Sequence, residues 1–405
     1  LHGIPASVKD NIGTAAPLHT TAGAEILLNH SPSHDANVVA QLRHAGAIIL
    51  GKASLSELAG ALTTEPPGFN AVSGMGRNPY RRDLPVAGSS SGSAISTAAS
   101  LALISIGTET SGSLIAPAAV NGVVAMKPSL NLVDSTGIVP LIRFQDSAGP
   151  MARSVTDAAI LLAAMDNVDV DYAAALDSTA LEGVTVGVLR DDIVVQDERG
   201  SDLNWLDLID QGLTKAKATT RDVTLQGHVE LVPVIFLGLA LETVPYFSAA
   251  GAPVKNLADL QAYNAAVPER RIPRGQNMLV LASRFVEAVM EQQGLKESEL
   301  GAAYQQLALE TQASAAAILD QAFKENALDI LVSLGNTHSP FYATAGYPAI
   351  TVPLGLSEKG TPNGVTFIGR RGEDAKLLAR AFAFEHATRY RVKVRVPFES
   401  GIKMK

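Results

Sequence analysis

The sequence predicts an α/β fold with a mostly buried β-sheet. Short apolar runs of strand character alternate with helical segments along the chain. Hydrophobic residues make up 47% of the 405 residues and charged residues only 18%, which favours a sizeable core over disorder. The strand signals gather toward the two ends of the chain, whereas the middle is mostly helical.

The first half of the chain alternates helices and strands. Asp35 is placed to cap the first helix, Gly46 to end it, and Ser154 to cap the last helix of this half. The expected elements are a helix over 38–44, a strand over 47–50, a helix of small residues over 93–102, a strand over 103–107 and a helix over 154–165.

The second half contains one long region with few strand signals. We interpret residues 190–327 as a divergent helical cap inserted into a single domain that spans 1–405. The expected elements are a strand over 184–189, helical stretches over 203–217 and 256–326, apolar strands over 328–334, 349–355 and 364–369, and an amphipathic helix over 374–388.

Charge and composition exclude several classes of partner. The net charge of −8 argues against nucleic acid, which requires a basic face. The absence of cysteine excludes disulfides and thiolate chemistry. The run 231–241 is apolar, but it contains Pro233 and Gly238 and is shorter than a membrane span, so no span is expected. The sequence does not decide between a monomer and a homodimer. Because the chain opens on Leu1, we expect an N-terminal part of the domain to be missing, and the cellular location stays open.

Two clusters of serine and glycine lie close together in the most apolar region. The first is Gly88–Ser93 and the second is Thr110–Ser113. Such clusters are often linkers, but these are flanked by segments too apolar to be exposed. A phosphate-binding loop would need a lysine followed by serine or threonine, and neither cluster has one. A nucleophilic serine explains the pattern better.

A serine hydroxyl needs a nearby base before it can act as a nucleophile. The eight histidines are scattered, and none lies in a recognisable histidine–aspartate context. A buried lysine is a second type of base, because burial favours its neutral form. Lys9 ends a strand-like apolar run in "GIPASVKDNI" and is the candidate, although a surface lysine is the alternative.

Four segments, in order, resemble the amidase signature family. They are "GIPASVKDNI", "AGSSSGSA", "GTETSGS" and "AGYPAITVP", and the resemblance extends from residue 1 to about residue 390. The forms "GSSSGS" and "GTET" look most like the peptide amidase branch, which removes C-terminal amides from peptides. The resemblance implies a large mixed sheet covered by helices on both faces.

The resemblance also implies a serine–cis-serine–lysine triad. Carried over by motif, the nucleophile is Ser113, the bridging residue is Ser89 with a cis peptide bond leading into it, and the base is Lys9. No metal or organic cofactor is implied. The oxyanion hole would be formed by the backbone N–H groups of Thr110, Ser111, Gly112 and Ser113.

Substrate contacts are expected from five further residues: Gly88, Ser90, Phe69, Phe144 and Asp146. For Asp146 the alternative is a carboxylate that organises its loop. The chain departs from the family at three positions: Ser111 stands where the family has glycine and the peptide amidase branch aspartate, Glu109 replaces an aspartate, and Ile115 replaces an arginine of some members. Small acidic amides are therefore poor candidates for the substrate.

The leading hypothesis is a free-standing serine amidase that acts on a peptide or small-molecule amide. One alternative is the glutamine-hydrolysing subunit of an amidotransferase complex. Others are an amidase for aryl amides, lactams or simple amides, and a non-catalytic binding protein that retains the fold.

Overall fold

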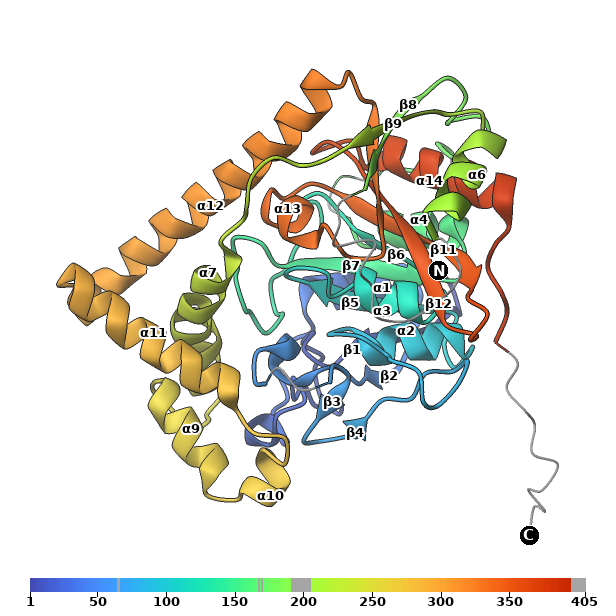
Figure 1. Ribbon diagram of the computed structural model, residues 1–405. Helices are drawn as coiled ribbons and strands as arrows, with labels where there is room; N and C mark the ends of the chain where they lie inside the picture. Colours follow the sequence, from blue (N-terminus) through green and yellow to red (C-terminus); the bar gives the residue numbers. More distant parts are fainter. Residues whose placement is uncertain (64–65, 167, 169, 191–204, 395–405) are drawn as a thin grey trace, which may run out of the picture.

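A mixed ten-stranded sheet runs through the molecule, in the order β2-β1-β5-β7-β6-β11-β12-β10-β8-β9 (Figure 1). The computed structural model describes residues 1–63, 66–166, 168, 170–190 and 205–394. At one end of the sheet, β1 is parallel to both of its neighbours, β2 and β5. At the other end, β8 is parallel to both β9 and β10. The central pairings are antiparallel. The strands are β1 Pro5–Lys9, β2 Ile48–Ala53, β5 Ile104–Glu109, β6 Val124–Lys127, β7 Ser147–Ala152, β8 Thr185–Leu189, β9 Thr219–Val223, β10 Ile330–Leu334, β11 Ala349–Leu356 and β12 Pro362–Ile368.

Helices cover both faces of the sheet, which confirms the expected architecture. On β6, for example, Val124 and Met126 pack into the core under α1, α4, α6 and α14, whereas Ala125 faces α2 and α3. The covering helices are α1 Asn37–His44, α2 Ser91–Ala98, α3 Ile115–Val120, α4 Val155–Ala163, α6 Trp205–Lys215, α13 Ser339–Thr344 and α14 Asp374–Thr388. Two short 3₁₀ helices, η1 Glu25–Leu27 and η2 Glu57–Gly60, and a small sheet of β3 Phe69–Asn70 and β4 Gly74–Met75 lie near the edge strand β2.

Helix starts were predicted with mixed success. Ser154 accepts a hydrogen bond from the backbone N–H of Asp157 and caps α4 as predicted. Asp35 does not cap α1: the N-cap is Ala36, and the Asp35 carboxylate instead accepts the backbone N–H of Ala15 at 2.8 Å. A carboxylate near the start of a helix can therefore accept a hydrogen bond from a neighbouring loop instead of capping the helix.

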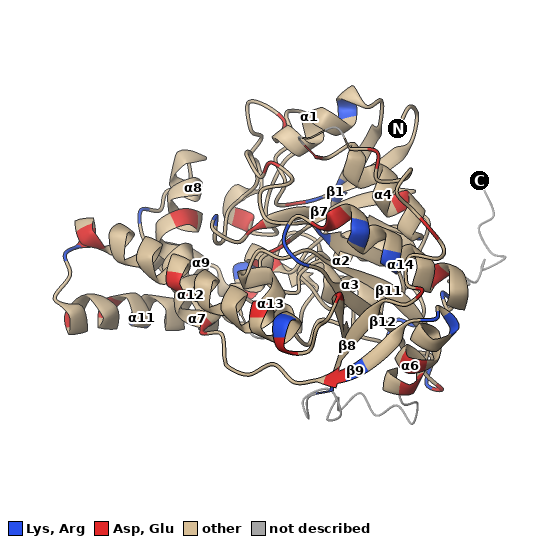
Figure 2. Cartoon of the chain, turned by 90° about the horizontal axis from the view of Figure 1, so that it is seen from above, with Lys and Arg blue, Asp and Glu red and all other residues tan. Residues whose placement is uncertain are grey.

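The helical lobe is shorter than the predicted cap. Helix α6 packs on α14 and strand β9 pairs with β8, so both belong to the sheet body rather than to the cap expected from 190 to 327. Part of that expectation, residues 191–204, lies outside the described residues. The lobe comprises α7 Leu231–Gly238, the π-helical turn Leu239–Thr243, α8 Val244–Ala249, α9 Leu257–Ala265, α10 Pro268–Arg271, α11 Asn277–Gln293 and α12 Glu297–Glu325. Figures 1 and 2 show it extending to one side of the sheet.

One apolar segment is longer than the sequence suggested. Pro233 and Gly238 do not interrupt it, and α7, the π-helical turn and α8 form a continuous helix over Leu231–Ala249, 19 residues long. By length and composition alone this helix is able to cross a membrane. In the structure 56% of its apolar window is buried, with Phe236, Leu237 and Phe247 in the core of the helical lobe.

Candidate active site

Lys9 ends strand β1 in the interior of the sheet. Later strands lie on both sides of β1, with Lys9 beside Ala53 of β2 and Val8 beside Ile106 of β5. The Lys9 side chain is 0% exposed. Its burial therefore does not depend on residues upstream of Leu1, because strands that follow it in the sequence enclose it.

The Lys9 amine contacts two neighbours. Nζ lies 2.7 Å from Ser89 Oγ, and it also lies 2.8 Å from Thr108 Oγ1 and 3.2 Å from the Thr108 carbonyl oxygen. Asn11 donates a further hydrogen bond to Thr108 Oγ1 at 3.0 Å. Thr108 thus holds the amine through two contacts, and the remaining contact joins the amine to Ser89.

Burial lowers the pKa of Lys9 from its usual value to about 7. Desolvation is the main cause, and it outweighs the attraction of Asp146 and Glu109, which raises the pKa. A large fraction of the amine is therefore neutral at neutral pH, as a proton acceptor must be.

Ser89 follows a cis peptide bond with Gly88, as the resemblance implies. A β-carbon at Gly88 would lie 2.1 Å from Ser56 Oγ, so only glycine fits there. The next residue, Ser90, is buried; its hydroxyl donates to the Thr108 carbonyl oxygen at 3.0 Å and accepts from the Thr108 N–H at 3.2 Å. Ser90 therefore ties the start of α2 to β5, and it does not line the pocket that contains Ser89.

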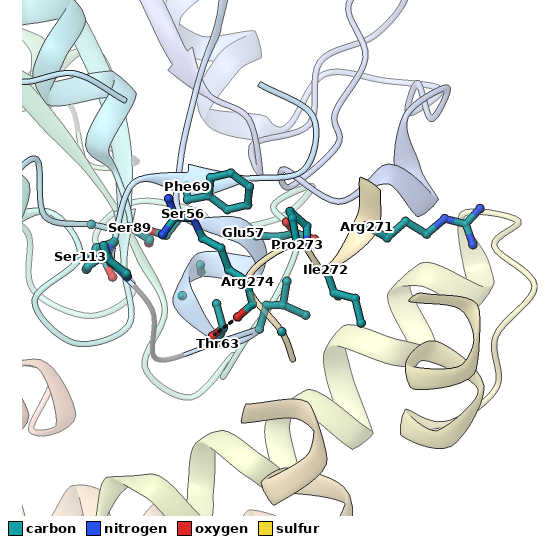
Figure 3. Close-up of a pocket in the computed structure, with 17 residues that line it drawn as sticks. Ser56, Glu57, Thr63, Phe69, Ser89, Ser113, Arg271, Ile272, Pro273 and Arg274 are labelled. Atoms are coloured by element: carbon teal, nitrogen blue, oxygen red, sulfur yellow. Dashed lines mark hydrogen bonds between the residues drawn. The ribbon is translucent and has the colours of Figure 1, made fainter. Parts of the chain in front are cut away.

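Ser113 lies in the turn between β5 and α3. Gly112 has φ +77°, and a β-carbon there would lie 2.9 Å from Asn336 Nδ2, so this tight turn requires glycine. Ser113 is 8% exposed and lines the same pocket as Ser89. Figure 3 shows the two serines side by side at one end of that pocket.

Glu109 organises the start of α3 behind Ser113. Its Oε2 accepts the backbone N–H groups of Leu114 at 2.8 Å and Ile115 at 3.1 Å. In the part of the chain that the structure describes, the N–H groups of Ser111, Gly112 and Ser113 donate to no other group. They are available to a developing oxyanion, which is the role predicted for this turn.

Two side chains of the turn are held from outside the pocket. The Thr110 hydroxyl donates to Asp146 Oδ1 at 2.5 Å. The Ser111 hydroxyl donates to Ser339 Oγ at 3.2 Å. The side chain at position 111, where this chain departs from the family, is thus turned toward α13.

The pocket beside the two serines has a volume of about 240 Å³. Of the predicted substrate contacts, Phe69 and Gly88 line it. Its other wall is the segment 271–275 of the helical lobe, and the Arg274 guanidinium lies 4.8 Å from the centre of the Phe69 ring (Figure 3).

Asp146 and Phe144 are not part of this pocket. Asp146 is buried, and its Oδ2 accepts the backbone N–H groups of Leu141 and Ile142, which is the loop-organising alternative. Burial raises the pKa of Asp146 to about 6. Phe144 packs edge-on against Tyr304 of α12, with ring centroids 5.5 Å apart.

Sequence reasoning missed several residues of the site. Thr108 lies within "GTET", but no local pattern in the sequence indicated that its side chain contacts Lys9. Glu57, Arg271 and Arg274 also line the pocket. Glu57 lies in "DANVVAQLRHAGAIILGKASLSELA", which is part of the family resemblance, but no role was predicted for it, and Arg271 and Arg274 lie in a segment without a recognisable motif. Their positions depend on how the loop after β2 meets the helical lobe.

Comparison with known proteins places the chain in a family. The family model "Amidase" matches residues 1–378. A probable amidase of Arabidopsis thaliana is 36% identical, over 96% of this chain and 77% of the relative.

Two further relatives bear on the substrate. The solved structure of a peptide amidase from Stenotrophomonas maltophilia superposes with a TM-score of 0.86 at 35% identity, and the match covers 98% of this chain and 84% of that one. A glutamyl-tRNA(Gln) amidotransferase component from a Nostoc species is 30% identical, over 96% of this chain and 84% of the relative.

Proposed function

This chain belongs to the amidase family, and we propose that it hydrolyses a carboxylic amide through an acyl-enzyme on Ser113. The observation that carries the proposal is the contact between the wholly buried amine of Lys9 and Ser89, which shares a pocket with Ser113. A neutral amine, one bridging hydroxyl and a second hydroxyl at a pocket suffice to activate a nucleophile.

The hydrogen bonds around Lys9 support a direction for proton transfer. A neutral amine has two N–H groups, and the two oxygen atoms of Thr108 accept them. The lone pair is then left for the Ser89 hydroxyl proton. Ser89 takes the proton of Ser113 as Ser113 Oγ attacks the amide carbonyl carbon.

The tetrahedral intermediate needs donors for its oxyanion. The N–H groups of Ser111, Gly112 and Ser113 are suited to this role because Glu109 accepts only the N–H groups that follow them. Removing one such donor typically costs about 100- to 1000-fold in rate. The carbon–nitrogen bond breaks as the proton returns from Lys9 through Ser89 to the leaving nitrogen, which departs as ammonia or an amine. Water then hydrolyses the ester, and Ser113 recovers its proton.

A peptide with a C-terminal amide is the substrate class that we propose. The similarity to the Stenotrophomonas peptide amidase over nearly the whole chain supports this choice. The pocket of about 240 Å³ has room for the end of a peptide rather than for a long segment. The alternative is a glutamine-hydrolysing subunit of an amidotransferase, which the similarity to the Nostoc protein supports.

Ammonia release by the purified chain tests the proposal, with a C-terminal peptide amide and free glutamine as separate substrates. We expect release from the peptide amide, and a loss of at least about 10⁴-fold in Ser113→Ala. Lys127→Met is a matched control for Lys9→Met, because Lys127 is also a fully buried lysine but donates to the Pro128 carbonyl and does not line the pocket.

The outcomes separate the hypotheses. Full activity in both Ser113→Ala and Lys9→Met would overturn the mechanism. Activity on glutamine alone, gained only with a partner protein, would favour the amidotransferase alternative. Labelling of Ser113 by a fluorophosphonate would contradict a purely binding role.

A further inference from the structure

Glu57 is a buried carboxyl group in the wall of the active-site pocket. It is 6% exposed and lines the pocket that contains Ser89 and Ser113. The preceding residue fixes its place, because the Ser56 N–H donates to the Ser89 carbonyl oxygen at 3.0 Å and Ser56 Oγ accepts the Gly68 N–H at 2.8 Å. The backbone just before Glu57 is therefore hydrogen-bonded to the backbone of Ser89, the bridging serine.

Only one of the two carboxyl oxygen atoms of Glu57 has a hydrogen bond. Oε2 accepts the backbone N–H of Ala71 at 2.8 Å, whereas Oε1 has no partner in the part of the chain that the structure describes. Oε1 is not one of the fully buried oxygen atoms without a partner, so it remains accessible from the pocket that Glu57 lines. In Figure 3, Glu57 lies between Phe69 and Pro273, within the pocket wall.

The charges around Glu57 restrict what it can bind. Burial and the neighbouring carboxylate of Glu25 raise the pKa of Glu57 to about 8, so above this pH the carboxyl group is ionised and both of its oxygen atoms accept hydrogen bonds. Arg271 and Arg274 line the same pocket, and Arg271 is paired with Glu25 at 2.9 Å. The Arg274 guanidinium disfavours an ammonium ligand, whereas a neutral N–H donor meets no such repulsion.

Building on the proposed function, we propose that Oε1 of Glu57 accepts the backbone N–H of the residue that carries the scissile amide. A peptide amide has this N–H on its acyl side, two bonds from the carbonyl carbon that Ser113 attacks. Simple carboxylic amides lack it. Glu57 is then the residue that selects peptidyl amides over other amides, since a buried acceptor left unpaired by the wrong substrate weakens its binding.

Two substrates that differ in one atom test the role of Glu57. One is the amide of an N-acetylated leucine; the other is its ester analogue, in which oxygen replaces the N–H. Ammonia release at about pH 9, where Glu57 is ionised and Lys9 is neutral, gives kcat/KM for each substrate. We expect the unmodified protein to prefer the N–H substrate by about 10-fold or more.

Glu57→Gln should abolish this preference. Because the Ala71 N–H needs an acceptor, the glutamine oxygen will face Ala71 and its NH₂ group, a donor, will face the substrate. The ratio of the two kcat/KM values should fall to about two or below. Comparing ratios removes any general difference in reactivity between the two substrates.

Glu385→Gln is the matched control. Glu385 is also buried with a pKa raised to about 7 and accepts a backbone N–H, from Val155, but it lies on α14 and does not line the pocket. Its ratio should equal that of the unmodified protein. An unchanged ratio in Glu57→Gln would overturn the proposal.

The unmodified protein gives an independent result if Glu57→Gln does not fold. Equal kcat/KM for the two substrates would refute the role of Glu57 while leaving amide hydrolysis intact. Failure to release ammonia from either substrate would instead count against the proposed function.

Discussion

Lys9 Nζ lies 2.7 Å from Ser89 Oγ, and the lysine that carries it is completely buried. The contact joins strand β1 to the turn before α2, 80 residues later in the chain. Burial of a lysine without a carboxylate in hydrogen-bond contact makes the charged form costly. The same burial that opposes the charge makes the amine a proton acceptor at neutral pH.

The first prediction concerns the pH dependence of the reaction. Since the neutral form of Lys9 is the proposed base and its pKa is about 7, kcat/KM should rise with pH through that value and then level off. Ammonia release measured between pH 5.5 and 9 gives the profile. A profile that is flat across pH 7 would exclude Lys9 as the base.

The second prediction concerns the stability of Lys9→Met. The pKa of Lys9 is about 7 in the folded protein and 10.5 in the unfolded chain. Between these two pH values Lys9 is therefore protonated in the unfolded chain but mostly neutral in the folded protein. The stability of the unmodified protein should therefore rise with pH in this window, relative to Lys9→Met, by up to about 1.4 kcal/mol per pH unit. Urea unfolding at several pH values measures the difference.

Lys127→Met provides a comparison for that experiment. The pKa of Lys127 is lowered to about 8 by the same desolvation, so this variant should show a similar trend above pH 8. Only Lys9→Met should also lose activity. A pH-independent difference for Lys9→Met would mean that the lysine is not charged differently in the two states.

The third prediction concerns Glu109. Glu109→Ala leaves the N–H groups of Leu114 and Ile115 without their acceptor, so the start of α3 should shift and misplace Ser113. We expect kcat to fall about 10- to 100-fold and the free energy of unfolding to fall by about 1–3 kcal/mol. Glu109→Gln keeps one acceptor oxygen and should lose less in both measurements. Equal losses in the two variants would argue against the acceptor role.

The fourth prediction concerns Ser111. Because its hydroxyl donates to Ser339 and only its backbone N–H is available to the oxyanion, Ser111→Ala should change kcat less than about threefold. Its free energy of unfolding should drop by about 1 kcal/mol or less. Steady-state kinetics and thermal unfolding check both values. A loss of 100-fold in kcat would assign the hydroxyl itself to the reaction.

The fold was predicted best where a local pattern was strong. The helix over 374–388 and the strands near 349–355 and 364–369 were found because apolar spacing and strand composition are local properties. Strand β7 was missed because its sequence, SAGPMA, contains glycine and proline, which usually disfavour a strand. Its neighbours β5 and β6 impose the strand conformation there.

The sequence by itself determined the residue types of the site: two hydroxyl-rich turns, a lysine at the end of a strand, and their order along the chain. Tertiary structure alone decided the pKa of Lys9, the pairing of Glu109 with α3, and which residues line the pocket beside Ser113. Glu57 and Arg274 come from segments more than 200 residues apart, and they line one pocket only because the helical lobe packs against the loop after β2. Burial and distance depend on such long-range contacts, and neither is encoded in a short stretch of sequence.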